Sequence, residues 1–253
     1  MRFRITAFGL HLLGSATALT LILGALYLGW YRWPGWYLTS VLRVVGIVVL
    51  VDLVIGPTLT LIVANPRKAR RVFARDVAII VTVQLAALVY GAVTLWNGRP
   101  LYYTFSVDRL EIVQASDIEA SEAATAQRRN PSLAPHWYSL PRWIWAPLPD
   151  DPAEALHIVN DASLGTGKDI IDMPRYFKPW EQGLPKLRDQ LVRLDDMKNL
   201  SKPQKQTLRL RMSERGLPVN ERNSIVMWGD SRQLLAVFDP ATLHLLAILR
   251  AQT

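Results

Sequence analysis

The sequence predicts an α-helical membrane bundle of three transmembrane helices, followed by an α+β domain. Three apolar runs, each long enough to cross a bilayer, occupy the first 96 residues. Charge divides at the same point, with nine Lys/Arg and two Asp/Glu before it and 20 Lys/Arg and 19 Asp/Glu after it. The second part alternates β-rich runs with amphipathic stretches. We therefore expect two domains, residues 1–96 and residues 97–253.

The three apolar runs are Ala7 to Tyr31, Val41 to Ala64 and Val77 to Trp96. At a rise of about 1.5 Å per residue, roughly 20 residues cover the hydrocarbon of a membrane. Buried helices of soluble proteins are seldom so uniformly apolar, so we interpret all three runs as spans that contact the lipid bilayer. The first run is too long for a cleaved signal peptide, and no small-residue cleavage site follows it. We expect it to remain as an anchor.

The basic residues predict the orientation of the spans. Arg2 and Arg4 precede the first span, and five of the eleven residues from Asn65 to Arg75, between the second and third spans, are basic. Cytoplasmic connections carry such an excess of Lys and Arg. We expect a cytoplasmic N-terminus and residues 97–253 in the periplasm, which places the chain in a bacterial inner membrane. The net charge of +8 then reflects topology, and we expect no binding to nucleic acid.

The C-terminal domain is predicted to mix helices and strands. Strand-like patterns occur at 101–107, 110–113, 224–228, 233–238 and 243–249. Helical patterns occur at 116–129, 152–163, 180–197 and 203–215. Residues 131–149 hold five prolines and are expected to be extended. A turn at Asp239-Pro240 between the last two strands predicts a C-terminal β-hairpin.

Asp52 is an acid in the middle of the second apolar run. An acid at membrane depth costs about 2.5–3.5 kcal/mol on insertion scales, so it is expected to face protein or water and to have a partner. Pro57 lies one turn later and predicts a kink, because it lacks a backbone N–H. The candidate partners are Thr58, Thr60 and Gln84. Three interpretations stay open: an acid that holds the three helices together, a contact with another protein's transmembrane helix, or a proton or ion pathway.

No motif in the sequence predicts catalysis. The chain has no Cys, which excludes thiol nucleophiles and thiolate metal sites. Its four histidines, at positions 11, 136, 157 and 244, show no metal-ligand spacing. Gly165-Thr166-Gly167-Lys168 lacks the first glycine and the final Ser or Thr of a phosphate loop, so we interpret it as a turn. We expect no catalytic residues, no metal and no cofactor, and we predict that the protein is not an enzyme.

Three strings in a fixed order remain to be explained. They are Asp52-x-x-x-Gly56-Pro57-x-x-Thr60 in the second span, Gln84 to Gly91 in the third, and Gly98-Arg99-Pro100-x-Tyr102 with Val107-Asp108-Arg109 just beyond it. In this order and spacing they resemble the type IV pilin accessory proteins of the TfpX/TfpZ family. The resemblance covers residues 1 to about 118, and the rest only in outline. By position, the family pattern falls on Asp52, Gly56, Pro57, Thr60, Gln84, Tyr90, Gly91, Arg99, Pro100, Asp108 and Arg109.

The resemblance implies a chaperone-like inner-membrane protein that binds the major type IV pilin subunit and supports its stability or assembly. Before assembly, such a subunit keeps an apolar helix in the bilayer and its globular head in the periplasm. We expect the second and third spans to contact that helix near Asp52. One alternative is a membrane-anchored periplasmic sensor or ligand-binding module, with a pocket lined by Trp137, Trp143 and Trp145. Another is an enzyme acting on pilin or lipid.

Overall fold

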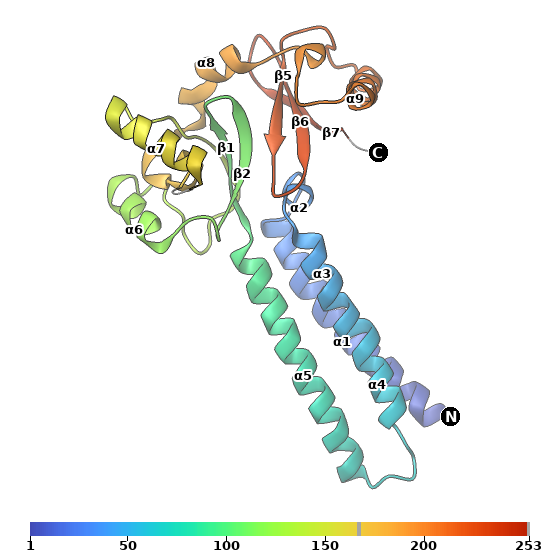
Figure 1. Cartoon of the computed structure of the whole chain (residues 1–253). Helices are drawn as coiled ribbons and strands as arrows, with labels where there is room; N and C mark the ends of the chain where they lie inside the picture. Colours follow the sequence, from blue (N-terminus) through green and yellow to red (C-terminus); the bar gives the residue numbers. More distant parts are fainter. Residues whose placement is uncertain (166–167, 252–253) are drawn as a thin grey trace. The chain divides into compact units, whose positions relative to one another are not determined.

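The computed structural model describes residues 1–165 and 168–251, and the chain divides into two compact units. The first unit comprises Met1–Trp36 and Ser40–Arg99, and the second comprises Tyr37–Thr39 together with the chain from Pro100 onward. Figure 1 shows the chain coloured along its sequence. The predicted fold class is confirmed, because three long apolar helices precede a mixed α/β unit with a seven-stranded sheet.

Three helices of the first unit are long and apolar enough to cross a membrane. They are α1 (Arg2–Gly29), the composite helix Val41–Val63 and α5 (Arg70–Asn97). Both α1 and α5 begin several residues before the predicted apolar runs, because Arg and Ala are good helix formers and continue the helices past the apolar part. The apolar runs thus predict the membrane-crossing segments but underestimate the length of the helices that contain them.

The second span changes its winding around Asp52. It consists of α3 (Val41–Val49), a π-helical segment η1 (Leu50–Ile55) and α4 (Gly56–Val63). Pro57 lies in the first turn of α4, where its missing N–H costs little. The backbone N–H of Gly56 donates to the carbonyl of Val51, five residues earlier. Where the sequence predicts a kink at Pro57, the structure therefore has a π-helical segment just before it. Such segments are frequent at functional sites.

The three spans pack through two apolar clusters within the first unit. Their buried members are Leu19, Val48 and Leu88 in one cluster and Leu26, Tyr31, Val41 and Leu95 in the other. The Tyr31 hydroxyl also donates a hydrogen bond of 2.6 Å to the backbone carbonyl of Leu95. The Trp30 and Trp96 rings meet edge to face with centroids 4.9 Å apart. These contacts join the first and third spans at one end of the bundle.

The second unit is built on a sheet with strand order β4–β3–β1–β2–β5–β6–β7. The strands are β1 (Pro100–Ser106), β2 (Arg109–Gln114), β3 (Arg142–Trp145), β4 (Lys178–Pro179), β5 (Ser224–Trp228), β6 (Gln233–Phe238) and β7 (Leu245–Arg250). β1 and β2 form an antiparallel hairpin, and β2 continues the sheet by pairing parallel with β5. β6 and β7 pair antiparallel, so the predicted C-terminal hairpin is confirmed.

Helices of the second unit connect these strands. They are α6 (Ala120–Arg129), α7 (Pro152–Leu164), α8 (Trp180–Gln190) and α9 (Lys202–Glu214), with short 3-10 turns η2 (Ile170–Asp172), η3 (Pro174–Tyr176) and η4 (Leu194–Asp196). The short helix α2 (Gly35–Leu38) lies between the first two spans. Gly165 ends α7 with a φ of 65°, whereas Thr166 and Gly167 of the predicted turn lie outside the described residues.

The helix predicted at 180–197 is shorter in the structure, and the segment predicted to be extended contains a strand. The helix predicted at 180–197 ends at Gln190, because Val192 leaves the helix to pair with Ser224 through two backbone hydrogen bonds of 3.0 and 3.1 Å. Leu191 and Leu194 are buried although both lie beyond the end of α8. The proline-rich segment contains strand β3, which pairs parallel with β1. Sequence patterns alone do not predict which residues of the two strands pair.

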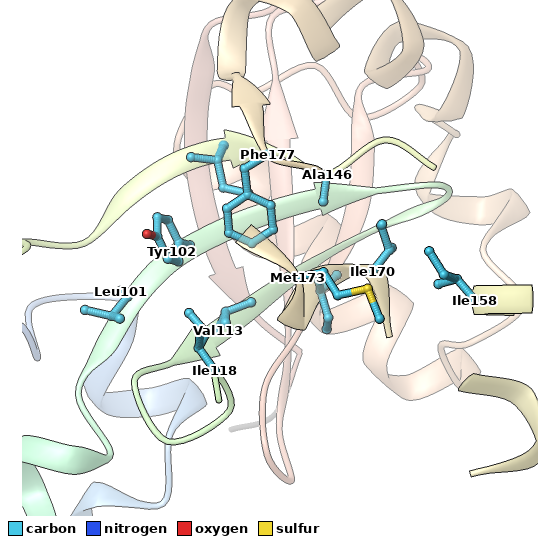
Figure 2. Close-up of a cluster of buried hydrophobic side chains, with 11 residues drawn as sticks. Leu101, Tyr102, Val113, Ile118, Ala146, Ile158, Ile170, Met173 and Phe177 are labelled. Carbon is cyan, nitrogen blue, oxygen red and sulfur yellow. The ribbon is translucent and has the colours of Figure 1, made fainter. Parts of the chain in front are cut away.

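Two apolar clusters among the described residues belong to the core of the second unit. One lies where β1 and β2 meet η2 and η3 and includes Leu101, Tyr102, Val113, Met173 and Phe177, which converge in Figure 2. The Tyr102 and Phe177 rings meet edge to face with centroids 5.0 Å apart. The other cluster joins α9 and η4 to the β5–β7 strands. Burial of these side chains is the main stabilising contribution to the unit.

The segment Tyr37–Thr39 belongs to the second unit, although it lies in the chain between two spans. Leu38 is buried there, and its carbonyl accepts a hydrogen bond of 3.0 Å from the backbone N–H of Asp230. Gly229 makes this approach possible, because a Cβ at that position would lie 2.3 Å from the Leu38 oxygen. The guanidinium groups of Arg232 and Arg250 lie 4.8 and 4.5 Å from the centre of the Tyr37 ring.

Candidate functional site: a buried polar cluster among the spans

Asp52 is buried in the first unit, with 3% of its surface exposed. The Gln84 amide nitrogen, from α5, donates to the Asp52 backbone carbonyl at 3.2 Å and to its carboxylate oxygen Oδ1 at 3.4 Å. The sequence named Gln84 as a candidate partner of Asp52, and the structure pairs the two. Thr58, another candidate, is exposed. The acid in the second span is thus joined to the third span by a polar side chain.

Gly56 and Gly91 allow the second and third spans to approach closely. A Cβ on Gly56 would lie 2.0 to 2.2 Å from the end of the Gln84 side chain, which occupies the space that a larger residue needs. A Cβ on Gly91 would lie 2.3 Å from Cγ2 of Val48. Both glycines are required for contact between neighbouring helices, as small residues commonly are in membrane proteins.

Thr60 joins the second span to the first. Its hydroxyl oxygen lies 2.5 Å from Nδ1 of His11, a hydrogen bond whose donor depends on the histidine tautomer. The sequence offered Thr60 as a partner of Asp52 and considered His11 only as a metal ligand, so the structure adds His11 to the cluster. An ionisable residue in an apolar span was the signal that could have identified it.

Two acceptor atoms of this cluster have no hydrogen-bond partner among the described residues. They are Oδ2 of Asp52 and Oε1 of Gln84, and both are buried. Gln84 itself is only 7% exposed. A buried polar atom without a partner costs roughly 1–3 kcal/mol, and more when the group is charged. Two acceptors of the cluster therefore lack the hydrogen bonds that a cluster serving only to stabilise the bundle would be expected to have.

A groove of about 530 Å³ opens onto this cluster. Asp52, Thr60 and Gln84 are polar residues of its lining, and His11 lies on the α1 side. The remaining lining consists of apolar or small residues: Phe3, Thr6, Ala7, Leu10, Gly14, Ser15, Ala18, Phe73, Val77, Val81, Leu85 and Leu88. An apolar wall with a few converging polar groups is typical of a binding site.

The other predicted site residues lie outside this groove. Pro57 is buried in the first turn of α4, whereas Tyr90 is 76% exposed on α5. Arg99 is buried at the end of α5, where its guanidinium lies 4.4 Å from the centre of the Trp96 ring and donates to the Trp96 carbonyl at 2.6 Å. Pro100 begins β1 of the second unit. Of the predicted intramembrane residues, Asp52, Thr60 and Gln84 therefore line the groove, whereas Pro57 and Tyr90 do not.

Asp108 and Arg109 lie at the turn between β1 and β2. Arg109 binds the carboxylates of Glu111 at 2.8 Å and Asp169 at 3.0 Å, and these ion pairs raise its pKa against the opposing effect of burial. Val107, just before this pair, has a φ of 46°, which is strained for a β-branched residue. The structure assigns Arg109 to a network of carboxylates within the second unit.

Asp172 is the most strongly perturbed carboxyl of that network. Burial, followed by the nearby charges of Asp117, Asp169 and Glu111, raises its pKa from the ordinary 3.8 to about 7, and Lys168 opposes the shift. No group of three or more His, Cys, Asp or Glu residues within the described part of the chain has the arrangement of a metal site.

Three curated proteins, all from Dichelobacter nodosus, are similar to this chain. The fimbrial assembly protein of serogroups C1 and C2 is 30% identical over 118 residues, which are 47% of this chain and 90% of the relative. The fimbrial assembly proteins of serogroups I and E1 are 28% and 27% identical over 138 residues, which are 53% of this chain and 54% of each relative. The chain thus spans about half the length of these last two. No family model and no solved structure matches it.

Substitution of Gly56 by Ala is expected to destabilise the chain by about 1–3 kcal/mol, because the new methyl group displaces Gln84 from Asp52. Gly46→Ala, in the same span, is the matched control. A Cβ on Gly46 meets no atom within 4 Å, so its effect is expected to be neutral or slightly stabilising. Denaturant unfolding of the full chain in detergent measures both. Equal stabilities of the two variants would contradict the proposed role of Gly56.

Stability of the second unit is expected to fall as the pH rises from about 4 to about 7. Folded Asp172 keeps its proton up to a pKa of about 7, while the unfolded chain loses it near 3.8, so the folded state binds the extra proton between these values. Unfolding of the full chain, followed by tryptophan fluorescence at several pH values, tests this. Asp172→Asn should flatten the pH dependence, and an unchanged profile in that variant would assign the dependence to other groups.

Proposed function

Since this chain belongs to the fimbrial assembly proteins, we propose that it is an inner-membrane accessory protein that binds a type IV pilin subunit and supports its stability or assembly. The observation that carries the proposal is the similarity to the fimbrial assembly protein of serogroups C1 and C2. This chain covers 90% of that relative at 30% identity. That relative's name refers to fimbrial assembly, and the similarity supports a role in pilus assembly for this chain. We propose in addition that the pilus is of type IV and that this chain binds its subunit.

The composition of the spans supports a location in the membrane where such a subunit is held before assembly. Three helices have the length and hydropathy of membrane spans. The basic connection between the second and third spans, residues 65–69, is expected to stay in the cytoplasm together with the start of α5. On this orientation the second unit lies in the periplasm. A chain so arranged has one part beside a subunit's apolar helix and another beside its globular head.

Two contacts on one chain strengthen each other. Once the apolar helix of the subunit is bound, its head is held near the second unit at a high effective concentration, so that each contact needs only modest affinity. A modest affinity suits an assembly factor, because the subunit must be released into the pilus. We assign the intramembrane contact to the neighbourhood of Asp52, and we propose no catalytic step.

The sensor alternative receives less support from the second unit. Trp137 is 72% exposed, whereas the Trp143 ring packs against the rings of Tyr103 and Trp180 with centroids 5.1 Å away in both cases. Trp145 lies against Gly183, where a Cβ would come within 2.6 Å of its ring. Trp143 and Trp145 therefore both pack against α8, whereas Trp137 is exposed.

Deletion of the gene is expected to lower the cellular level of the fimbrial subunit and to reduce surface pili severalfold, and the wild-type gene is expected to restore both. Asp52→Leu, which removes the carboxylate, should restore neither fully, whereas Asp52→Asn keeps an acceptor oxygen and should restore more. Immunoblots of subunit and chain, with electron microscopy of pili, provide the readouts. Subunit transcript level is the control. Unchanged subunit and pili in the deletion strain would reject the proposed function.

A further inference from the structure

The groove beside Asp52 has its walls on α1 and α5, and its polar floor consists of Asp52 and Thr60 of the second span and Gln84 of α5. Phe3 and Phe73 meet at one end of it with ring centroids 5.3 Å apart, and Ala18 and Leu88 line the other end. From Phe3 to Ala18 the α1 wall is about 22 Å long at the rise of an α-helix. The lining thus runs along several helical turns within the part of the bundle that crosses the membrane.

The α1 wall presents small residues to the groove. Ala7, Gly14, Ser15 and Ala18 recur with His11 at spacings of three and four, which places them on one face of the helix. A Cβ on Gly14 would meet no atom within 4 Å, so the space in front of this face is open. Small residues on an exposed face allow another helix to approach closely within a bilayer.

The floor of the groove requires a hydrogen-bond donor. Oδ2 of Asp52 and Oε1 of Gln84 are buried acceptors with no partner among the described residues, and both side chains line the groove. Lipid acyl chains have no donors, so they would leave both atoms unpaired. A protein segment that crosses a bilayer next to lipid is helical, since its backbone must satisfy its own hydrogen bonds. The complementary occupant is therefore an apolar helix with one polar donor.

We propose that this groove seats a single membrane-spanning helix of a partner protein, which packs over the small-residue face of α1 and presents a hydroxyl, amide or amine donor to Asp52 and Gln84. The identification of this helix with that of the fimbrial subunit rests on the proposed function. The seat lies between the first and third spans, with Asp52 of the second span and Gln84 of the third supplying the polar floor. The sequence alone predicts the contact on the second and third spans, near Asp52.

Photocross-linking in cells tests the seat. A benzophenone amino acid replaces Val81, which lines the groove, or Ile79, which is exposed on the same helix and lies outside the lining. We expect adducts with a partner's apolar helix from position 81 and not from position 79. Mass spectrometry of the adduct should place a side chain with a hydrogen-bond donor next to the cross-link. A contact segment without any donor would contradict the proposal.

A matched pair of variants tests occupancy of the groove. Gly14→Leu puts a side chain into the groove, whereas Gly9→Leu adds the same side chain to the same helix outside the lining. Neither position has an atom within 4 Å of a new Cβ, so both variants are expected to fold, which the membrane level of the chain checks. The position-81 adduct should fall at least about tenfold with Gly14→Leu, equivalent to about 1.4 kcal/mol, and stay unchanged with Gly9→Leu.

The outcomes separate this inference from the proposed function. An adduct with the fimbrial subunit's helix supports both. A groove-specific adduct with the helix of another protein supports the seat and contradicts the subunit as partner. Adducts with lipid alone, equal adducts from positions 79 and 81, or equal effects of the two glycine variants overturn the seat. If deletion of the gene still lowers subunit and pili in those cases, the proposed function stands without the groove.

Discussion

The hydrogen bond between Gln84 and Asp52 is the constraint on which the membrane bundle depends. Inside hydrocarbon, no water replaces a missing partner, so an acid in the second span must find one on another helix. Gln84 supplies it from α5, and the approach requires Gly56 to lack a side chain. Thr60 and His11 make the corresponding link to the first span. Four polar side chains thus hold together three helices whose other contacts are mainly apolar.

The same cluster also connects the fold to function, because it is only partly satisfied. A cluster that served packing alone would be expected to pair its buried acceptors, since each unpaired one reduces stability. Here two acceptors remain without partners among the described residues, and both belong to side chains that line a groove with a small-residue wall. In the proposed seat, a donor on the partner helix pairs these acceptors and restores the lost stability. A helix without such a donor does not, so the bundle can select one apolar helix among many.

Much of this was predictable from the sequence, and the rest depended on contacts between distant segments. Apolar length gives the three spans, and an acid among apolar residues identifies Asp52. The pairing with Gln84 was predictable because few polar residues exist in the spans. His11 was missed because its partner Thr60 lies 49 residues away in the sequence. Strand β3 and the early end of α8 were not predicted for the same reason, since both depend on backbone pairing with segments far along the chain.

Binding between the purified full chain and the purified fimbrial subunit, both in lipid nanodiscs or mild detergent, tests the proposed function directly. We expect a saturable complex that weakens when the apolar helix of the subunit is removed, because that helix provides the proposed intramembrane contact. Equal binding with and without that helix would exclude the intramembrane contact, and no binding by a chain that is demonstrably folded would exclude the proposed function.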